Sequence, residues 1–226
     1  MTQGLTFLAG YRWSKALDES EEAFFDADAY STPNPKNDRG PASFNVPNQF
    51  LCSYSWMIPT PHGIGSVGSY VLGGWETNGI LTLHSGLPFT ISSGIDDSLS
   101  AISKDRADLV GNPGLPGGRS TAQQLQEWFN TQAFVVNALG TFGTSERNFL
   151  EGPGLANLDF SIVRSFPIKK GPLAEKQALQ FRTELFNSLN HPNFNAPSAS
   201  VSSSTFGRVT SAGNPRILQF GLKFVY

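Results

Sequence analysis

The sequence predicts an all-β protein, an antiparallel up-and-down transmembrane β-barrel segment with long extracellular loops and one short loop helix. Six stretches alternate between apolar and polar residues. Each has roughly the 9–11 residues that a tilted strand needs to cross a bilayer, whereas soluble strands usually have about 5–6. Long and short connections alternate between the stretches, as in outer-membrane barrels. About six strands make an incomplete barrel, because the smallest single-chain barrels have about eight.

The composition agrees with strands and turns. The 226 residues include 23 Gly, 15 Pro and 18 Phe, and 15% are charged, against about 25% in average soluble domains. Sixteen basic and 18 acidic side chains nearly balance, with no basic block, so nucleic acid is not an expected partner. The single Cys52 excludes an internal disulfide. No apolar run reaches the roughly 20 residues of a transmembrane helix, and the N-terminus does not read as a signal peptide.

Each expected strand has one apolar face and one polar face, because side chains alternate along a strand. In chain order, the apolar faces consist of Leu5, Phe7, Ala9, Tyr11 and Trp13; Phe50, Cys52, Tyr54, Trp56 and Ile58; Trp75, Thr77, Gly79, Leu81 and Leu83; Leu158, Phe160 and Ile162; Leu179, Phe181, Thr183 and Leu185; Leu218, Phe220, Leu222, Phe224 and Tyr226. Aromatic rings near strand ends favour the lipid–water interface. The expected interface aromatics are Tyr11, Trp13, Trp56 and Trp75.

The connections predict the direction of the strands. The first link is long and acidic, the third runs from about Leu87 to Leu155, and the fifth is long and rich in Ser and Asn. The second and fourth links are short. Long loops are extracellular and short turns periplasmic in outer-membrane barrels. The strands that begin near Leu5, Trp75 and Leu179 are therefore expected to run outward, with the C-terminus on the periplasmic side.

One helix is expected within the longest loop. Ser120 and Gln123 have the spacing of a capping box. Leu125, Trp128 and Phe129 form an apolar stripe behind it. We expect this helix to pack on the rim of the barrel or over its mouth.

No motif indicates an enzyme, and no cofactor or metal ion is expected. His62, His84 and His191 are far apart in the sequence, whereas a zinc site needs paired His or Cys at short spacing. No G-x-S-x-G motif occurs, and "GNPGLPGGRS" lacks the Lys-Ser/Thr ending of a phosphate loop. His84 on a polar face could touch a ligand, but a solvated histidine is the simpler interpretation.

An acidic cluster in the first long link leaves two interpretations open. Its members are Asp18, Glu19, Glu21, Glu22, Asp26 and Asp28. Clustered carboxylates suit Ca²⁺, but the spacing is not that of an EF-hand. A solvated extracellular loop is the simpler interpretation.

The final strand has a pattern of its own. It carries polar Gln219, then Gly221, then aromatic Phe224 and terminal Tyr226. This pattern resembles the β-signal that the barrel-assembly machinery recognises on the last strand of bacterial outer-membrane proteins. An unpaired strand edge is a template for another strand, which makes such recognition physically reasonable.

The chain as a whole resembles the C-terminal barrel of TonB-dependent outer-membrane receptors, in particular the Oar-like branch. The resemblance is carried by "GLTFLAGYRWSKALD", "NDRGPASFNVPNQF", "LGGWETNGILTLHSGLPFTI", "EWFNTQAF", "GTFGTSERNFLEGPGLANLDFSIVRSFPI", "LQFRTELFNSLNHPNF" and "FGRVTSAGNPRILQFGLKF". It implies a barrel of about 22 strands closed around an N-terminal plug. Residues 1–226 would then be the C-terminal part of the receptor barrel, inactive alone because the plug, the TonB box and the other strands are missing.

The resemblance also implies a place and partners. The chain would lie in the outer membrane of a Gram-negative-type bacterium, and the receptor would take up a large or scarce ligand with energy passed from TonB. Its partners would be outer-membrane lipid, the barrel-assembly machinery, and the rest of the receptor, through which it reaches TonB. Charged residues on the polar faces would contact water, the plug or each other. These residues are Arg12, Glu76, Asp159, Arg182, Glu184 and Lys223.

A second hypothesis is a soluble or surface-displayed β protein that binds ligands or partners through its long loops. The apolar faces distinguish the two hypotheses, because they meet lipid in a barrel and a packed core in a soluble protein. A composite barrel assembled from several short chains is a weaker third hypothesis.

Overall fold

The computed structural model describes residues 4–19, 35–101, 105–168 and 177–225. Its main feature is a six-stranded antiparallel sheet in the order β1-β4-β5-β10-β11-β12. The bounds are β1 (Leu5–Trp13), β4 (Asn48–Met57), β5 (Trp75–His84), β10 (Leu155–Pro167), β11 (Ala178–Phe186) and β12 (Ile217–Val225). Each strand pairs with the next of the six along the chain, which is the predicted up-and-down order. The all-β fold class is confirmed, and the sheet is open and not a closed barrel.

The strand register confirms the predicted faces. Residues that lie directly opposite each other on neighbouring strands point to the same side of the sheet. One row of such partners runs through all six strands. This row consists of Phe7, Tyr54, Gly79, Phe160, Leu185 and Leu218. The neighbouring row, on the opposite side, consists of Thr6, Ser55, Asn78, Ser161, Glu184 and Gln219. The sheet therefore has one apolar face and one polar face along its whole width.

Gly79 has a packing reason within the apolar row. The ring of Tyr54 lies over Gly79, so that a Cβ added there would overlap the ring. Tyr54 is also the direct cross-strand partner of Gly79. A glycine in mid-strand usually costs stability; here it makes room for an aromatic ring on the neighbouring strand.

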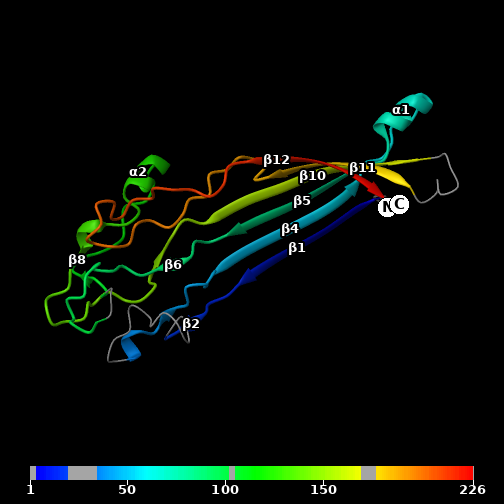
Figure 1. Cartoon of the computed structure of the whole chain (residues 1–226). Coiled ribbons are helices and arrows are strands. Elements are labelled where there is room, and N and C mark those ends of the chain that lie inside the picture. Colours follow the sequence, from blue (N-terminus) through cyan, green and yellow to red (C-terminus); the bar gives the residue numbers. More distant parts are fainter. Residues whose placement is uncertain (1–3, 20–34, 102–104, 169–176, 226) are drawn as a thin grey trace.

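The two ends of the sheet differ (Figure 1). The start of β1, the end of β12 and α1 (Gly65–Leu72) lie at one end, where α1 joins β4 to β5. The three long connections lie at the other end, with α2 (Thr121–Gln126) among them. Their remaining elements are β2 (Leu17–Asp18), η1 (Pro35–Asn37), β3 (Gly40–Pro41), β6 (Pro88–Phe89), β7 (Asp108–Leu109), η2 (Thr131–Ala133), β8 (Phe134–Val135) and β9 (Leu150–Glu151).

The long connections fold together into what we call the loop cap, the described parts of residues 14–47, 85–154 and 187–216. Short antiparallel pairs join β2 to β3, β6 to β9 and β7 to β8. A bridge between Ser92 and Ser200 ties the second long loop to the third. Arg147 reaches Asp18 and so ties the second long loop to the first.

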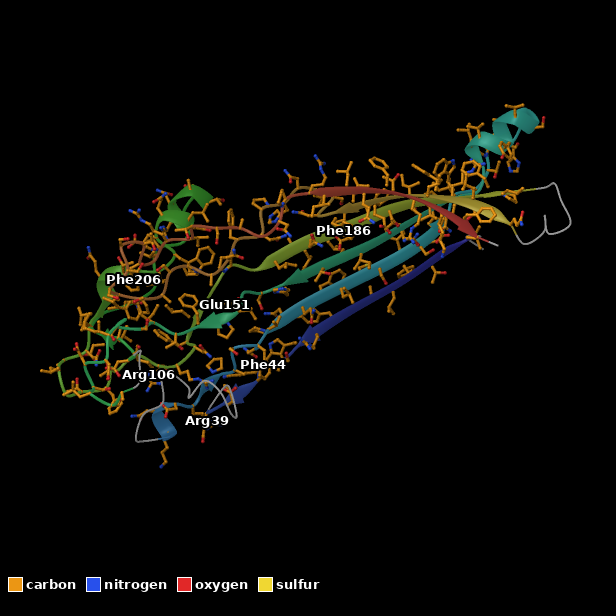
Figure 2. All side chains as sticks on the ribbon, in the orientation of Figure 1. Arg39, Phe44, Arg106, Glu151, Phe186 and Phe206 are labelled. Atoms are coloured by element: carbon orange, nitrogen blue, oxygen red, sulfur yellow. The ribbon has the colours of Figure 1, made fainter. Side chains whose placement is uncertain are left out.

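The hydrophobic core lies in the loop cap and not in the sheet. The buried cluster consists of Ile91, Ala107, Phe129, Ala133 and Phe134, with Phe206 packed against it. The ring of Phe129 meets those of Phe206 and Phe134 edge-on, with centroid distances of 5.2 and 5.6 Å. Figure 2 shows Phe206, which packs against this cluster, at the cap end. The cap thus holds the kind of core that a water-soluble unit has.

Two α-helices occur in the described residues, and one of them was predicted. Ser120 Oγ accepts from the Gln123 backbone N–H, and the Gln123 side chain accepts from the Ser120 N–H, so the capping box is confirmed. The helix ends at Gln126, before Trp128 and the buried Phe129, so the predicted apolar stripe lies mostly beyond it. α1 was not predicted, since its segment reads as a short glycine-containing turn.

Candidate functional site

The apolar face of the sheet is the first candidate functional surface. Phe7 is 69% exposed, Phe220 67% and Leu222 68%, although all three lie on the face that a soluble protein would bury. Exposed apolar patches much larger than a few hundred Å² mark a surface that meets lipid or another protein. The extent of this face over six strands fits lipid, because a continuous apolar band is what a membrane barrel presents outward.

The expected interface aromatics lie at the two ends of that face. Tyr11 and Trp13 are near the cap end, and the Tyr11 hydroxyl donates to Asn48 Oδ1 at 2.6 Å. Trp56 and Trp75 are near the other end, and Trp75 Nε1 donates to Val71 O at 3.1 Å. Rings at two separate levels are the arrangement of two aromatic girdles. Their contact with lipid stays a prediction.

The polar face carries charges of both signs. Arg182 Nη2 and Glu184 Oε1 form an ion pair at 2.6 Å, which realises one of the expected contacts. Glu76 Oε1 accepts from the Ser55 hydroxyl at 3.0 Å. Asp159 Oδ1 accepts from the Asn187 backbone N–H at 2.9 Å. Apolar side chains, among them Leu8, Leu51 and Ile80, also lie on this side, but polar side chains are the majority, which suits a water-filled lumen.

A shallow pocket lies on the sheet between β5, β10 and β11. Its volume is about 170 Å³, and it is lined by Asn78, Ile80, Asp159, Ser161, Glu184 and Phe186, among others. These residues belong to the polar side of the register. The pocket could hold a small polar group or several waters, with two carboxylates facing it.

A second pocket lies where the sheet meets the loop cap. Its volume is about 250 Å³, and it is lined by Trp13, Lys15, Asn45, Phe149 and Glu151, among others. Glu151 is fixed by two hydrogen bonds, because its Oε1 accepts from Gly86 N–H at 2.9 Å and its backbone O accepts from Trp128 Nε1 at 2.8 Å. Figure 2 shows Glu151 and Phe44 at this junction.

Two ion pairs of buried arginines hold the loop cap together. Arg147 is 1% exposed, and its Nη1 lies 2.5 Å from Asp18 Oδ1 and 3.2 Å from Asp38 O. Arg106 Nη2 lies 3.3 Å from Asp38 Oδ1, with both side chains almost fully buried. Such pairs are strongly destabilising to break, since a lone buried charge remains.

Asp105 is the buried carboxylate of the cap with a perturbed pKa. Burial alone would raise that pKa, but hydrogen bonds outweigh it and hold the pKa below the usual value. The Ser98 hydroxyl and backbone N–H each donate to the carboxylate at 2.7 Å, and Asn137 Nδ2 donates at 3.0 Å. Asp105 thereby ties the loop around Ser98 to the cap core.

The expected assembly signal lies on an edge strand. β12 is the last strand of the sheet and pairs with β11 alone. Gln219 and Gly221 lie on the polar face opposite Glu184 and Arg182, and Phe224 lies on the apolar face opposite Leu179. Tyr226 lies outside the described residues. Among the described strands β12 has a neighbour on one side, and its recognition as an assembly signal stays a prediction.

Other sequence candidates are not brought together. His84 is on the polar face with Nδ1 2.6 Å from Ser85 O, and His191 bonds within its own loop. In the described part of the chain, no three His, Cys, Asp or Glu residues are grouped so that they could hold a metal ion. Of the acidic cluster, Glu21, Glu22, Asp26 and Asp28 lie outside the described residues, and Asp18 is paired with Arg147.

Sequence reasoning missed two kinds of residue. The buried Asp38, Arg106 and Arg147 gave no signal, because each stands among other charged residues of its loop. Arg164 gave a clear one, because it continues the apolar series Leu158, Phe160, Ile162 by one more step, and the register pairs it with Trp75.

One family model matches the chain. It is described as an outer membrane beta barrel domain, and it covers residues 1–219. Comparison with curated proteins and comparison with solved structures give no match. None of the helices in the described ranges is long and apolar enough to span a membrane.

Proposed function

The chain belongs to the outer membrane beta barrel domain family, and from that premise we propose that it is part of the barrel of a TonB-dependent receptor for energised uptake. The membership gives the chain a role as a membrane barrel and a place in the outer membrane. The receptor identity, the energised uptake and the Gram-negative-type host are the proposal. The sequence resemblance through nearly the whole chain motivates it.

The observation that carries the proposal is the two-sided sheet. Its apolar side spans six strands, and the opposite side has a continuous polar row from Thr6 to Gln219. A polar inner wall with charges of both signs suits a lumen occupied by water and a folded plug. Closed barrels have no free edges, so further strands are expected to pair at β1 and β12 and to complete the wall.

The loop cap supports the same proposal. A folded extracellular cap above the lumen can hold a large ligand before uptake, and loops on a rigid scaffold are where binding residues concentrate. In this proposal the chain binds and guides a ligand and catalyses no reaction. The partners are lipid, the plug and further strands, TonB through them, and the barrel-assembly machinery acting on Gln219, Gly221 and Phe224.

The alternative of a soluble β protein is disfavoured. It requires the faces that contain Phe7 and Phe220 to lie in a packed core, yet both side chains are mostly exposed. The buried hydrophobic cluster lies in the loop cap instead.

Cross-linking in intact cells tests the receptor identity without knowledge of the ligand. The protein that contains the chain is tagged at its chromosomal gene, cross-linked with formaldehyde and purified under denaturing conditions. We expect TonB to be recovered with it, and to be absent from a parallel purification of a porin from the same membranes. Equal recovery of TonB from both, or from neither, would refute the proposal.

A further inference from the structure

Arg164 is an unusual residue on the apolar face. It pairs with Trp75 on β5 and with Phe181 on β11, so its side chain points to the same side as theirs. Among the described residues of the six strands, it is the one charged residue on this side. A guanidinium that faces hydrocarbon is costly unless it finds partners.

The partners of Arg164 come from α1. Its Nη1 donates to Val71 O and its Nη2 donates to Tyr70 O, in the last turn of the helix. The last carbonyls of a helix have no partners within the helix and carry the negative end of its dipole. No carboxylate of the described chain forms an ion pair with Arg164. The end of the helix therefore takes the place of a counter-ion.

Aromatic rings enclose the same guanidinium. Its Cζ lies 4.4 Å from the ring centroid of Phe166, 5.4 Å from that of Trp75 and 5.7 Å from that of Tyr70. Cations are attracted to ring faces at these distances. Trp75 also donates from Nε1 to Val71 O, so strand and helix share two kinds of contact. Arg164 is 5% exposed as a result.

These contacts fix α1 on the apolar side of the sheet, at the end where it joins β4 to β5 (Figure 1). The helix has no charged residue, and none of its residues is buried. Val67 is 77% exposed, and Tyr70, Val71 and Leu72 are each more than half exposed. The exposed apolar side chains of this helix adjoin the apolar face of the sheet. Lipid is the solvent that suits both.

We propose that α1 is a membrane-interface anchor, which lies among the phospholipids at the periplasmic boundary of the bilayer and is held there by Arg164. A short apolar helix of this kind binds the boundary between headgroups and acyl chains through buried apolar area. Lipid fits better than additional strands, because those would attach at β1 and β12, whereas α1 joins β4 to β5 within the sheet. The inference rests on membership of the barrel family and not on TonB.

Spin-label accessibility tests the proposal. The protein is purified from outer membranes with Cys52→Ser and Val67→Cys, labelled with a nitroxide, and reconstituted in vesicles of phosphatidylethanolamine and phosphatidylglycerol. Collisions with oxygen, which enters lipid, are compared with collisions with a water-soluble nickel chelate. Leu139→Cys is the matched control, because Leu139 is 74% exposed in the loop cap.

We expect the label at Val67 to collide more with oxygen than with nickel, and the label at Leu139 to do the reverse. A label at Val67 that behaves like the one at Leu139 would place the helix in water and overturn the proposal. A label that meets neither collider would be covered by protein, which overturns it equally.

A second pair of variants tests the role of Arg164. Arg164→Gln, in the Val67→Cys background, is expected to raise nickel collisions at Val67 and to increase label mobility. Arg164→Lys is expected to do so less, because one ammonium can satisfy one of the two carbonyls well. Arg182→Gln on the polar face is the control and should change neither reading. Unchanged nickel collisions and label mobility with Arg164→Gln would refute the claim that Arg164 holds α1 in place. If this variant fails to assemble, the measurement at Val67 alone still decides whether the helix contacts lipid.

Discussion

Arginine placed at two adjacent positions of β12 separates the membrane barrel from a soluble sheet. Phe220 lies on the apolar face opposite Thr183, and Gln219 lies on the polar face opposite Glu184. Phe220→Arg and Gln219→Arg thus introduce the same side chain at nearly the same depth, one residue apart. Only the direction in which the side chain points is different.

The expected costs follow from the two environments. Phe220 is the fourth of the nine residues of β12, close to the middle of the strand. Arginine on the lipid face at the midplane costs about 2–4 kcal/mol, which is a factor of about 30–700 in the folding equilibrium. At position 219 the arginine faces a wet lumen and a carboxylate partner, so we expect a change within about 0.5 kcal/mol.

Guanidinium unfolding of the protein in phospholipid vesicles measures both costs, with intrinsic Trp fluorescence as the signal. The amount of each variant recovered in the outer membrane provides a second reading, and Phe220→Arg is expected to lower it. Phe7→Arg and Phe181→Arg repeat the test on other strands. Equal costs for Phe220→Arg and Gln219→Arg would refute the assignment of the two faces.

Three further predictions follow from the packing and the cap. Gly79→Ala should destabilise the sheet by about 1–3 kcal/mol in denaturant unfolding, since the added methyl group overlaps the Tyr54 ring. Arg147→Met should lose about 1.5–3 kcal/mol of cap stability, measured by hydrogen exchange of cap amides, because it removes the charged hydrogen bond to Asp18. The pKa of Asp105 in the folded state is lowered from 3.8. Its contribution to cap stability is therefore present above that pH and is lost as the pH falls through the folded-state pKa. Asp105→Asn should remove this loss, measured by hydrogen exchange of cap amides at decreasing pH.

Each of these predictions has a control. Gly10→Ala should be nearly neutral, because a Cβ at Gly10 meets nothing within 4 Å; a cost equal to that of Gly79→Ala would contradict the packing argument. Arg39 is exposed beside the buried Asp38, so Arg39→Met should leave cap exchange unchanged. If the cap still loses stability in acid in the Asp105→Asn variant, other carboxylates cause that loss.

The six strands and their faces could be predicted because each strand meets two different environments. An apolar environment on one side and a more polar one on the other favour a period of two, so Phe7, Phe160 and Phe220 fall on one side from the sequence alone. The capping box of Ser120 was equally visible, since it depends on residues three positions apart. Local patterns of this kind need no knowledge of distant contacts.

Other features depend on residues far apart in the chain and had no local pattern. Arg147 and Asp18 are 129 positions apart, and their pairing depends on how two long loops meet. α1 contains two glycines, which disfavour a helix. Its last turn accepts hydrogen bonds from Arg164 of β10. Tertiary contacts of this sort override local propensity, and a sequence period does not report them.

The hydrophobic core lies in the loop cap and not in the sheet, so these two parts of the protein suit different solvents. The cap has its own aromatic cluster and ion pairs, which suit water, while the apolar face of the sheet suits lipid. A substitution in the cap therefore has to preserve the packing of the cap and not that of the sheet. If the cap binds the ligand as proposed, ligand preference can change through the cap while the wall of the barrel stays as it is.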